Sequence, residues 1–358
     1  MSAPTVAIAM SGGVDSSVAA ILLKEQGYRV IGLTMDLGIA AAPGKDAAAI
    51  AAQLDIPLVV LPYQQLFEQT VIHPFTAEYR DGVTPNPCVA CNRLMKFGVL
   101  AKQAFAEGAT YFATGHYARI ITSPGSAASL AVAANRAKDQ SYFLYGIEAD
   151  LLDRIIFPLG DIADKQSVRE IARKRGLAVA DKQDSQEICF VPNDDYAGFL
   201  EKRCPELQVP GEIRHISGQR LGYHRGTYRY TVGQRKGLGI AWHEPLYVLE
   251  IIPKTRTVIV GERSYLFCRG LTATACNWLA PLPDTPLLAK VRYRHHGVSS
   301  SVIMSNNGST MDLHFSEPQA GIAPGQSVVL YHEDRVLGGG IISTGIPVSP
   351  RDAEAPAD

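Results

Sequence analysis

The feature that most constrains this chain is a glycine-containing turn between a predicted strand and a predicted helix: Ser11-Gly12-Gly13-Val14-Asp15-Ser16-Ser17. The apolar run Val6–Met10 precedes it, and the helical pattern Val18–Leu23 follows it. Paired glycines let the backbone approach an anion closely, and the free N–H groups and dipole of a helix N-terminus favour negative charge. The turn fits neither Gly-x-x-x-x-Gly-Lys-Ser/Thr nor Gly-x-Gly-x-x-Gly. It therefore predicts a phosphate cradle of another kind; the alternative is a plain junction in which Asp15 and Ser16 are only caps.

Length and composition limit the class of protein. The 358 residues exceed one ordinary domain, and a hydrophobic content of 46% suffices for a sizeable core. No stretch approaches the roughly 20 consecutive apolar residues that span a bilayer. We therefore expect a soluble, cytoplasmic protein with no membrane partner. Six cysteines in a chain this long predict reactive or metal-binding thiols and buried spares, not a disulfide framework.

The order of the predicted elements divides the chain into three domains and a tail. Residues 1–205 alternate short apolar runs with helical stretches, which predicts an α/β domain with a doubly wound parallel sheet. Turns rich in glycine and period-two runs such as Leu246–Ile252 predict a small β-rich central domain over residues 206–268. Short strands separated by turns predict a C-terminal β-barrel over residues 269–347, and residues 348–358 are expected to form a disordered tail.

Within these domains the pattern also predicts individual elements. In the first domain the expected strands are Thr5–Met10, Arg29–Met35, Leu58–Leu61 and Tyr111–Thr114, and the expected helices are Ala47–Leu54, Phe97–Glu107 and Ser167–Arg175. In the C-terminal domain the expected strands are Leu288–Tyr293, Ser301–Met304, Met311–Phe315, Ser327–Tyr331 and Arg335–Ile342.

A local basic patch lies in the central domain, although the net charge of the chain is −1. Residues 213–265 contain nine Arg and Lys residues and three acidic ones. Arg, Tyr and Gly alternate in Arg225–Tyr230, which places phosphate-binding side chains beside stacking surfaces. The patch predicts an RNA-binding face, with a merely solvated basic β-surface as the alternative.

Two segments carry thiols that could react. Thr84–Arg93 contains two prolines and a Cys-x-x-Cys pair, Cys88 and Cys91, which suits a thiolate nucleophile, a redox pair or half a metal site. Cys189 follows a polar and acidic run near the end of the first domain. Because a thiol must ionise to react, we expect a positive or helix-start environment around these sulfurs.

The loop resembles the pyrophosphate-binding loop of ATP pyrophosphatases, and further motifs make the resemblance specific. They are Pro85-Asn86-Pro87-x-x-x-Cys91-Asn92, Ala113–Tyr117, Lys138–Leu144, Asp184-Ser185, Ile188–Phe190, Gly233–Gly239, Arg292-Tyr293 and Pro324–Gln326. Together they resemble the family of bacterial tRNA-specific 2-thiouridylases over nearly the whole chain, as far as Pro347.

The resemblance implies a reaction and its participants. ATP would adenylate the C2 oxygen of the wobble uridine of a tRNA, and the products would be 2-thiouridine, AMP and pyrophosphate. Cys189 would carry a persulfide sulfur delivered by a relay from a cysteine desulfurase, and Cys91 would attack as the partner thiol, releasing sulfide or closing a disulfide between them. Mg2+ is expected because charge develops on the leaving pyrophosphate, and we expect a monomer.

The family also implies binding residues. Those for ATP are Ala9, Met10, Ser11, Gly12, Gly13, Val14, Asp15, Ser16, Met35 and Gly115. Asn86, Pro87 and Cys88 would face the target base, and His116, Lys138, Asp139, Gln140, Arg292, Tyr293 and Gln326 would contact tRNA.

One position departs from the family, because many members have Asp where this chain has Cys88. Three cysteines, Cys88, Cys91 and Cys189, could instead hold a [4Fe-4S] cluster with one open iron, giving the same product by another route. A rival enzyme, an adenylating ligase or lysidine synthetase, would need neither Cys91 nor Cys189. A rival of another class is a non-catalytic RNA-binding protein with a decayed nucleotide fold.

Overall fold

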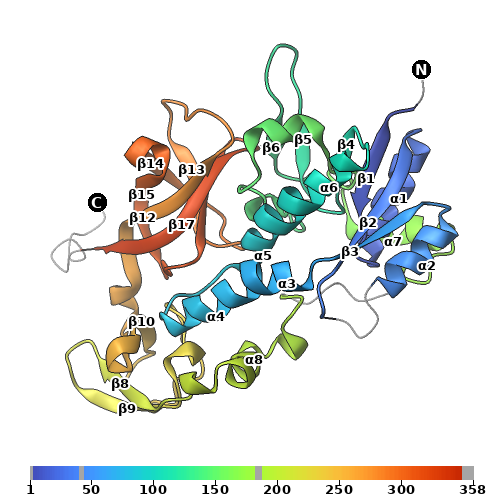
Figure 1. Ribbon diagram of the computed structural model, residues 1–358. Coiled ribbons are helices and arrows are strands. Elements are labelled where there is room, and N and C mark those ends of the chain that lie inside the picture. The colour runs from blue at the N-terminus through green and yellow to red at the C-terminus, as the bar shows by residue number, and fades with distance from the viewer. Residues whose placement is uncertain (1–2, 40–43, 182–187, 349–358) are drawn as a thin grey trace.

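The computed structural model describes residues 3–39, 44–181 and 188–348, which form three β-sheets and their covering helices (Figure 1). The motif Asp184-Ser185 and the tail expected from residue 349 onward lie outside the described residues. No helix in the described ranges is both long enough and apolar enough to cross a membrane.

The first sheet is parallel throughout and has helices on both faces, as predicted. Its strands stand in the order β3-β2-β1-β4-β7, and they are β1 Thr5–Ala9, β2 Arg29–Asp36, β3 Leu58–Pro62, β4 Tyr111–Ala113 and β7 Ile155–Ile156. Alternate residues of β1 supply two cores: Val6 and Ile8 pack on one face, and Ala7 packs on the other. The core that contains Val6 and Ile8 also contains residues of α1 (Val14–Glu25), α2 (Lys45–Gln53) and α7 (Lys165–Lys174).

The strand order of the first sheet reverses where the predicted loop lies. Beyond β1 the chain continues outward to β2 and β3 on one side, whereas β4 lies on the other side. Ligands of open parallel sheets bind at such a reversal, outside the carboxyl ends of the strands. The loop that begins with Ser11 follows β1, and Gly115 follows β4, so both lie at this edge.

A long helical run begins directly after the two prolines of the cysteine segment. It comprises α5 (Pro87–Ala90), η2 (Cys91–Leu100) and α6 (Ala101–Ala106), whereas the sequence predicted a helix only from Phe97. Proline is favoured in the first turn of a helix, where its missing N–H is not needed. The middle part, η2, is a π-helix, in which residues five apart share a face.

The central domain is built on a four-stranded sheet in the order β10-β11-β8-β9. The strands are β8 Gly211–His215, β9 Arg220–His224, β10 Tyr247–Ile252 and β11 Thr257–Gly261. Ile213, Val248, Val258 and Val260 form its small core. Helix α8 (Tyr196–Arg203) leads into this sheet and lies beside α4 (His73–Arg80) of the first domain (Figure 1).

The C-terminal strands close into a six-stranded barrel, which confirms the predicted barrel. The ring order is β12-β15-β14-β13-β16-β17, closed by pairing of β12 with β17. The strands are β12 Phe267–Trp278, β13 Leu287–Lys290, β14 Val298–Ser305, β15 Thr310–Ala320, β16 Ser327–His332 and β17 Arg335–Pro347. Strand β12 was not predicted. A hairpin of the first domain, β5 (Arg119–Ile121) and β6 (Ser129–Ala131), extends the sheet beyond β17.

Candidate active site

The loop after β1 is held in shape by its own hydroxyl groups. Ser16 Oγ and Ser17 Oγ donate to the carbonyl of Gly13 over 3.1 and 2.8 Å. Gly12 has a φ of +76°, and a Cβ there would lie 2.5 Å from Cβ of Asp46, at the start of α2. Only glycine therefore fits this close approach. Met10 and Val14 are buried in the core, so they offer the site backbone groups, not side chains.

Asp15 is the charged centre of the loop, and two partners hold its carboxylate. Lys165 Nζ donates to Oδ1 and Oδ2 over 2.6 and 2.7 Å, and the hydroxyl of Tyr117 donates to Oδ1 over 2.8 Å. Lys165 is 14% exposed in its side chain and lies at the start of α7. Lys165 was not predicted as a site residue. Its position is the one signal that could have pointed to it: Lys165 lies in the first turn of a helix, where the helix dipole disfavours a cation.

Gly115, which follows β4, brings the end of this strand into contact with the loop after β1. A Cβ at Gly115 would lie 2.7 Å from the backbone nitrogen of Ser16, so the two segments are in backbone contact. Met35 lies near the carboxyl end of β2 and is partly buried. The structure thus brings Ala9, Ser16, Met35 and Gly115 to the ends of neighbouring strands at the same sheet edge.

The three cysteines of the two thiol segments lie in one electrostatic neighbourhood. Cys88 is in the first turn of α5, Cys91 begins η2, and both Cys91 and Ile188 pack against the same core cluster. Burial is the largest of the effects that raise the pKa of Cys189 to about 11, and negative charge on Cys91 and Cys88 contributes to the same increase, although the residue as a whole is exposed. All six cysteines are free thiols in this structure.

The expected ionising environment is only partly present. Burial also raises the pKa of Cys91, while the positive charge of Lys96 acts in the opposite direction on Cys91 and on Cys189. Because burial is the larger effect for both residues, both thiols are protonated at neutral pH in this structure. The expected positive charge is therefore present as Lys96, and Cys88 lies in the first turn of α5, but burial outweighs the charge of Lys96 at Cys91 and Cys189.

Lys96 connects the thiols to the nucleotide loop through His116. Lys96 Nζ lies 3.3 Å from His116 Nε2, and His116 Nδ1 lies 2.7 Å from Thr114 Oγ1, one residue before Gly115. The imidazole packs near the rings of Phe97 and Phe157. Burial, and then the charge of Lys96, hold the pKa of His116 well below its usual value. The neutral ring therefore accepts from Lys96 at Nε2, which places its proton on Nδ1 toward Thr114.

Several residues expected to contact tRNA make contacts within the protein. Asp139 is buried, and its carboxylate accepts hydrogen bonds from Ala133 N and from the backbone and hydroxyl of Ser141. Gln140 Oε1 accepts from the backbone N–H of Tyr117 over 3.0 Å. These contacts order the turn that carries His116. Lys138, next to them, is partly buried.

The remaining tRNA candidates lie on the barrel. Tyr293 packs against Phe143, with ring centroids 4.6 Å apart, while Arg292 is exposed and donates to the carbonyl of Ala320 over 3.3 Å. Gln326 donates to the carbonyls of Thr84 and Pro85, directly before Asn86 and Pro87. The barrel thus touches the segment that leads to Cys88.

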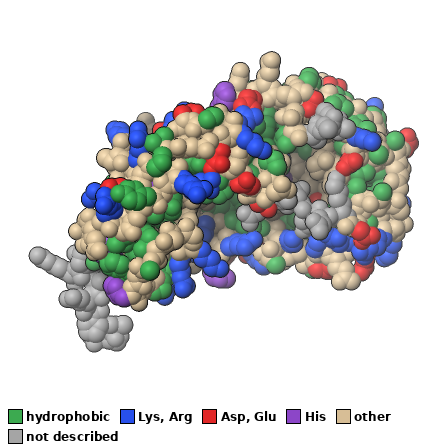
Figure 2. Space-filling model, turned by 90° about the horizontal axis from the view of Figure 1, so that it is seen from below, with side chains coloured by type: hydrophobic (Ala, Val, Ile, Leu, Met, Phe, Trp, Pro, Cys, Tyr) green, Lys and Arg blue, Asp and Glu red, His purple; other side chains and the backbone are tan. Residues whose placement is uncertain are grey.

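The basic patch of the central domain is partly neutralised by acidic residues just outside it. Arg214 and Arg220 pair with Glu212, and Arg229 pairs with Glu201. Figure 2 shows Lys and Arg side chains on one face of the molecule with acidic side chains among them. A groove of about 610 Å³ is lined by Arg235 and by residues 237–246, which include Trp242. An arginine beside an aromatic ring fits a nucleic-acid contact.

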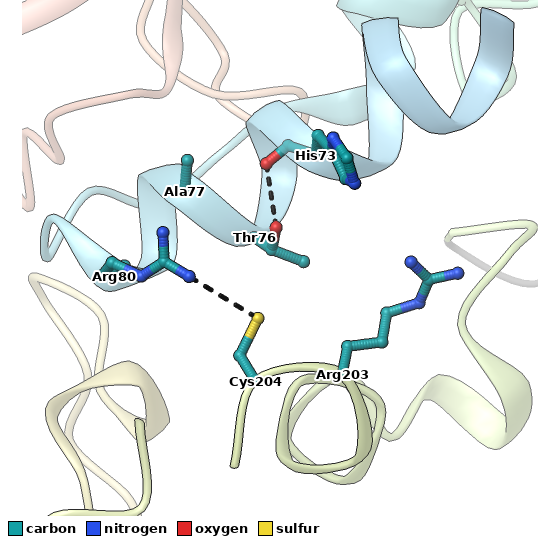
Figure 3. A pocket seen from close by; sticks show the side chains of 6 residues that line it. All are labelled: His73, Thr76, Ala77, Arg80, Arg203 and Cys204. Atoms are coloured by element: carbon teal, nitrogen blue, oxygen red, sulfur yellow. Dashed lines mark hydrogen bonds between the residues drawn. The ribbon is translucent and has the colours of Figure 1, made fainter. Parts of the chain in front are cut away.

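A separate cavity of about 360 Å³ lies between α4 and α8 (Figure 3). Arg80 faces Cys204 across it and donates to the sulfur over 3.8 Å. Arg80 also pairs with Glu206, and Arg203 pairs with Glu68. None of the predicted site residues lines this cavity, so it is distinct from the loop and cysteine site.

A metal ion would need donors at close range. In the described part of the chain, one group of three such side chains has its ligand atoms within 4.8 Å of one another: His243, Glu244 and Glu262. The sulfur atoms of Cys88, Cys91 and Cys189 do not all lie within this distance of one another. A zinc ion with Zn–S bonds of about 2.3 Å would hold tetrahedral thiolate sulfurs about 3.8 Å apart. Their spacing does not fit a single zinc ion. A cluster spreads its ligands over several irons, so this spacing does not test it.

Comparison with known proteins covers all three domains. Residues 4–193, 197–262 and 268–342 match the family models described as tRNA methyl transferase HUP domain, tRNA methyl transferase PRC-barrel domain and Aminomethyltransferase beta-barrel domain. A protein of Pelobacter propionicus named tRNA-specific 2-thiouridylase MnmA is 50% identical over 357 residues, covering 98% of this chain and 99% of its own. The protein of that name from Trichlorobacter lovleyi is 51% identical over 344 residues, covering 94% and 97%.

Proposed function

Because this chain belongs to the tRNA-specific 2-thiouridylase family, we propose that it makes 2-thiouridine in two steps, on the loop and on the cysteines described above. The enzyme is a tRNA-modifying sulfurtransferase. The contact chain Thr114–His116–Lys96 carries this proposal, because it joins the nucleotide loop to the charge that acts on both thiols.

The first step is activation of the uridine. ATP lies at the carboxyl ends of β1, β2 and β4, with its phosphates against the loop and the start of α1. The C2 oxygen of the wobble uridine attacks the α-phosphorus, and pyrophosphate leaves. Lys165, held by Asp15, is the protein cation at the loop and stabilises the charge on the leaving group. Mg2+ would add charge neutralisation, and the carboxylate of Asp15 is a ligand that it accepts.

The second step is sulfur transfer. Cys189 is exposed and suits a thiol that takes sulfur from a docking donor, a relay from a cysteine desulfurase, as a persulfide. Cys91, half-buried beside it, attacks the Sγ of Cys189 as a thiolate. The terminal sulfur leaves with the electron pair of the S–S bond and replaces AMP at C2. A Cys91–Cys189 disulfide remains, and an external thiol must reduce it. We propose that the enzyme acts as a monomer.

The iron–sulfur route is the second candidate for the sulfur step. The proximity of Cys88 to Cys91 and Cys189 favours it, because their charges act on one another. Three thiolates would leave one iron open, where four is usual. Anaerobic purification with iron and sulfide quantitation separates the routes. Iron-free protein that thiolates tRNA from a persulfide donor excludes the cluster.

The function is tested by supplying the enzyme with ATP, tRNA and a persulfide donor. AMP and 2-thiouridine, measured by chromatography and nucleoside mass spectrometry, should form in equal amounts. AMP without 2-thiouridine would indicate another adenylating enzyme. Binding of tRNA without AMP release would indicate a non-catalytic RNA-binding protein.

A further inference from the structure

The segment that leads into the cysteine helix is bonded to the barrel. Gln326 Nε2 donates to the carbonyl of Thr84 over 3.1 Å and to the carbonyl of Pro85 over 3.1 Å. The backbone N–H of Thr84 donates in return to the carbonyl of Pro324 over 3.0 Å. Three hydrogen bonds thus join two residues of this segment to one turn of the barrel.

Close backbone packing fixes the same contact. Gly325 has a φ of +87°, and a Cβ there would lie 2.2 Å from Cγ1 of Val83 and 2.6 Å from the carbonyl oxygen of Thr84. On the other side, Gly82 lies so near the central domain that a Cβ would be 2.8 Å from Pro253 Cγ. The segment is therefore held between the barrel and the central domain.

The segment depends on outside donors and acceptors. Pro85 and Pro87 have no N–H group, so neither can donate to a local turn or ladder. Backbone carbonyls that are not exposed to water need a donor, and Gln326 supplies it to two of them in succession. A glutamine amide has two N–H donors in one plane, which suits neighbouring carbonyls.

What the segment carries is the start of the cysteine helix. Helix α5 begins at Pro87, Cys88 lies in its first turn, and Cys91 begins η2 directly after it. Farther along, Asn92 Nδ2 donates to the carbonyl of Phe143 over 3.0 Å and tethers the helix to the first domain. The barrel bond at Thr84 and Pro85 is thus the anchor on the N-terminal side of both cysteines.

We propose that Gln326 is a positioning residue that holds the Thr84–Pro85 segment and thereby sets the place of Cys88 and Cys91. This role rests on the proposed function only for the reactive role of Cys91. The anchoring of the segment by Gln326 is independent of the proposed function. It differs from the tRNA contact that the family resemblance implies, because the amide donors are engaged within the protein. Loss of the anchor changes the cysteine site before any tRNA binds.

The test therefore uses the full chain without tRNA or ATP. Gln326→Met keeps the length of the side chain and removes the donors, and Gln326→Ala removes both. The matched control is Gln319→Ala, because the Gln319 amide donates to Glu317 and Pro318 within the barrel. The readouts are amide hydrogen exchange over residues 83–92 and the rate of iodoacetamide labelling of Cys91, both by mass spectrometry.

In both Gln326 variants the exchange at Thr84 and Cys88 should accelerate by about five- to tenfold, since loss of a hydrogen bond eases local opening by that order. The labelling rate of Cys91 should change by a similar factor, and Gln319→Ala should match the wild type. Exchange and labelling within twofold of the wild type in Gln326→Met would overturn the proposal and leave the direct tRNA contact that the family resemblance implies. Neither readout needs turnover, so a protein that fails to thiolate tRNA still tests the anchor.

Discussion

The ammonium group of Lys96 lies 3.3 Å from Nε2 of His116, between the thiol neighbourhood and the strand end that borders the nucleotide loop. This contact keeps near Cys91 and Cys189 a positive charge that favours their thiolates, although burial is the larger effect and raises the pKa of both thiols. A neutral His116 is required for the contact, because a protonated ring would repel the ammonium group. The two halves of the reaction therefore share one polar connection through the protein.

Replacing Lys96 should impair sulfur transfer but spare activation. Lys96→Met removes the charge that favours the thiolates, so 2-thiouridine formation should fall by about tenfold or more. Pyrophosphate release, which reports activation, should stay within about twofold, because Lys96 does not contact the loop. Single-turnover assays that quantify pyrophosphate and 2-thiouridine measure the two effects.

Two variants control this experiment. Lys96→Arg keeps the charge and should retain more sulfur transfer than Lys96→Met. Lys102→Met, an exposed position of α6 on the same helical run, should leave both products unchanged. Equal losses of pyrophosphate and 2-thiouridine in Lys96→Met would contradict the assignment to the second step.

The reactivity of Cys189 should have a displaced pH dependence. Its pKa is raised to about 11, mainly by burial, whereas a free thiol titrates near 8.5. Only the thiolate is nucleophilic, so iodoacetamide labelling of Cys189 should keep rising through pH 9 and level off only near pH 11. Short incubations across this range, read by peptide mass spectrometry beside glutathione, measure the curve. A plateau at or below pH 9 would be inconsistent with the structure.

Lys165 should act in the activation step. Lys165→Met removes the cation bonded to Asp15 at the loop, so AMP release should fall by about 100-fold, the order seen when one transition-state charge partner is lost. Lys174→Met at the exposed end of the same helix is the matched control and should behave as the wild type. Normal AMP release in Lys165→Met would remove Lys165 from the site.

Gly115→Ala should damage the loop without unfolding the domain. The new Cβ would lie 2.7 Å from Ser16 N, so the loop must shift and ATP binding should weaken by about tenfold or more. Gly222→Ala is the control, because no atom lies within 4 Å of its Cβ position. Calorimetric titration with a non-hydrolysable ATP analogue and a thermal melt distinguish local from global effects. Equal affinities in the two variants would contradict the contact.

The parallel sheet could be predicted because buried parallel strands appear as continuous apolar runs. The expected strand Thr5–Met10 is β1, Thr5–Ala9, which is one residue shorter than expected. The helix expected from Phe97 starts at Pro87. The earlier start was not predicted, because two prolines and a cysteine pair resemble a loop, although the first turn of a helix accepts proline. Strand β12 was not predicted. Its residues form a strand because they pair with β17 when the barrel closes, and this pairing is not visible in the local sequence.

The parts of the site formed by residues that are adjacent in the sequence were predicted. The contacts between residues far apart in the sequence were not. The loop and Gly115 follow from local motifs. The partner of Asp15 is Lys165, 150 positions away, and no local pattern joins the two. Gln326 was expected to contact tRNA, but a bond to Thr84, 242 positions away, is visible only in the fold. The domain boundaries at residues 205, 268 and 347 stay predictions.

We expect Cys91 and Cys189 to act after activation by ATP at the loop. The most direct test is a single turnover with tRNA, ATP and a persulfide donor, comparing the wild type with Cys91→Ser, Cys189→Ser and the control Cys276→Ser on β12. Both catalytic variants should release pyrophosphate, the product of the activation step, yet form less than about 1% of the wild-type 2-thiouridine, while Cys276→Ser forms the full amount. Undiminished 2-thiouridine in either Cys91→Ser or Cys189→Ser would contradict the role of these two cysteines.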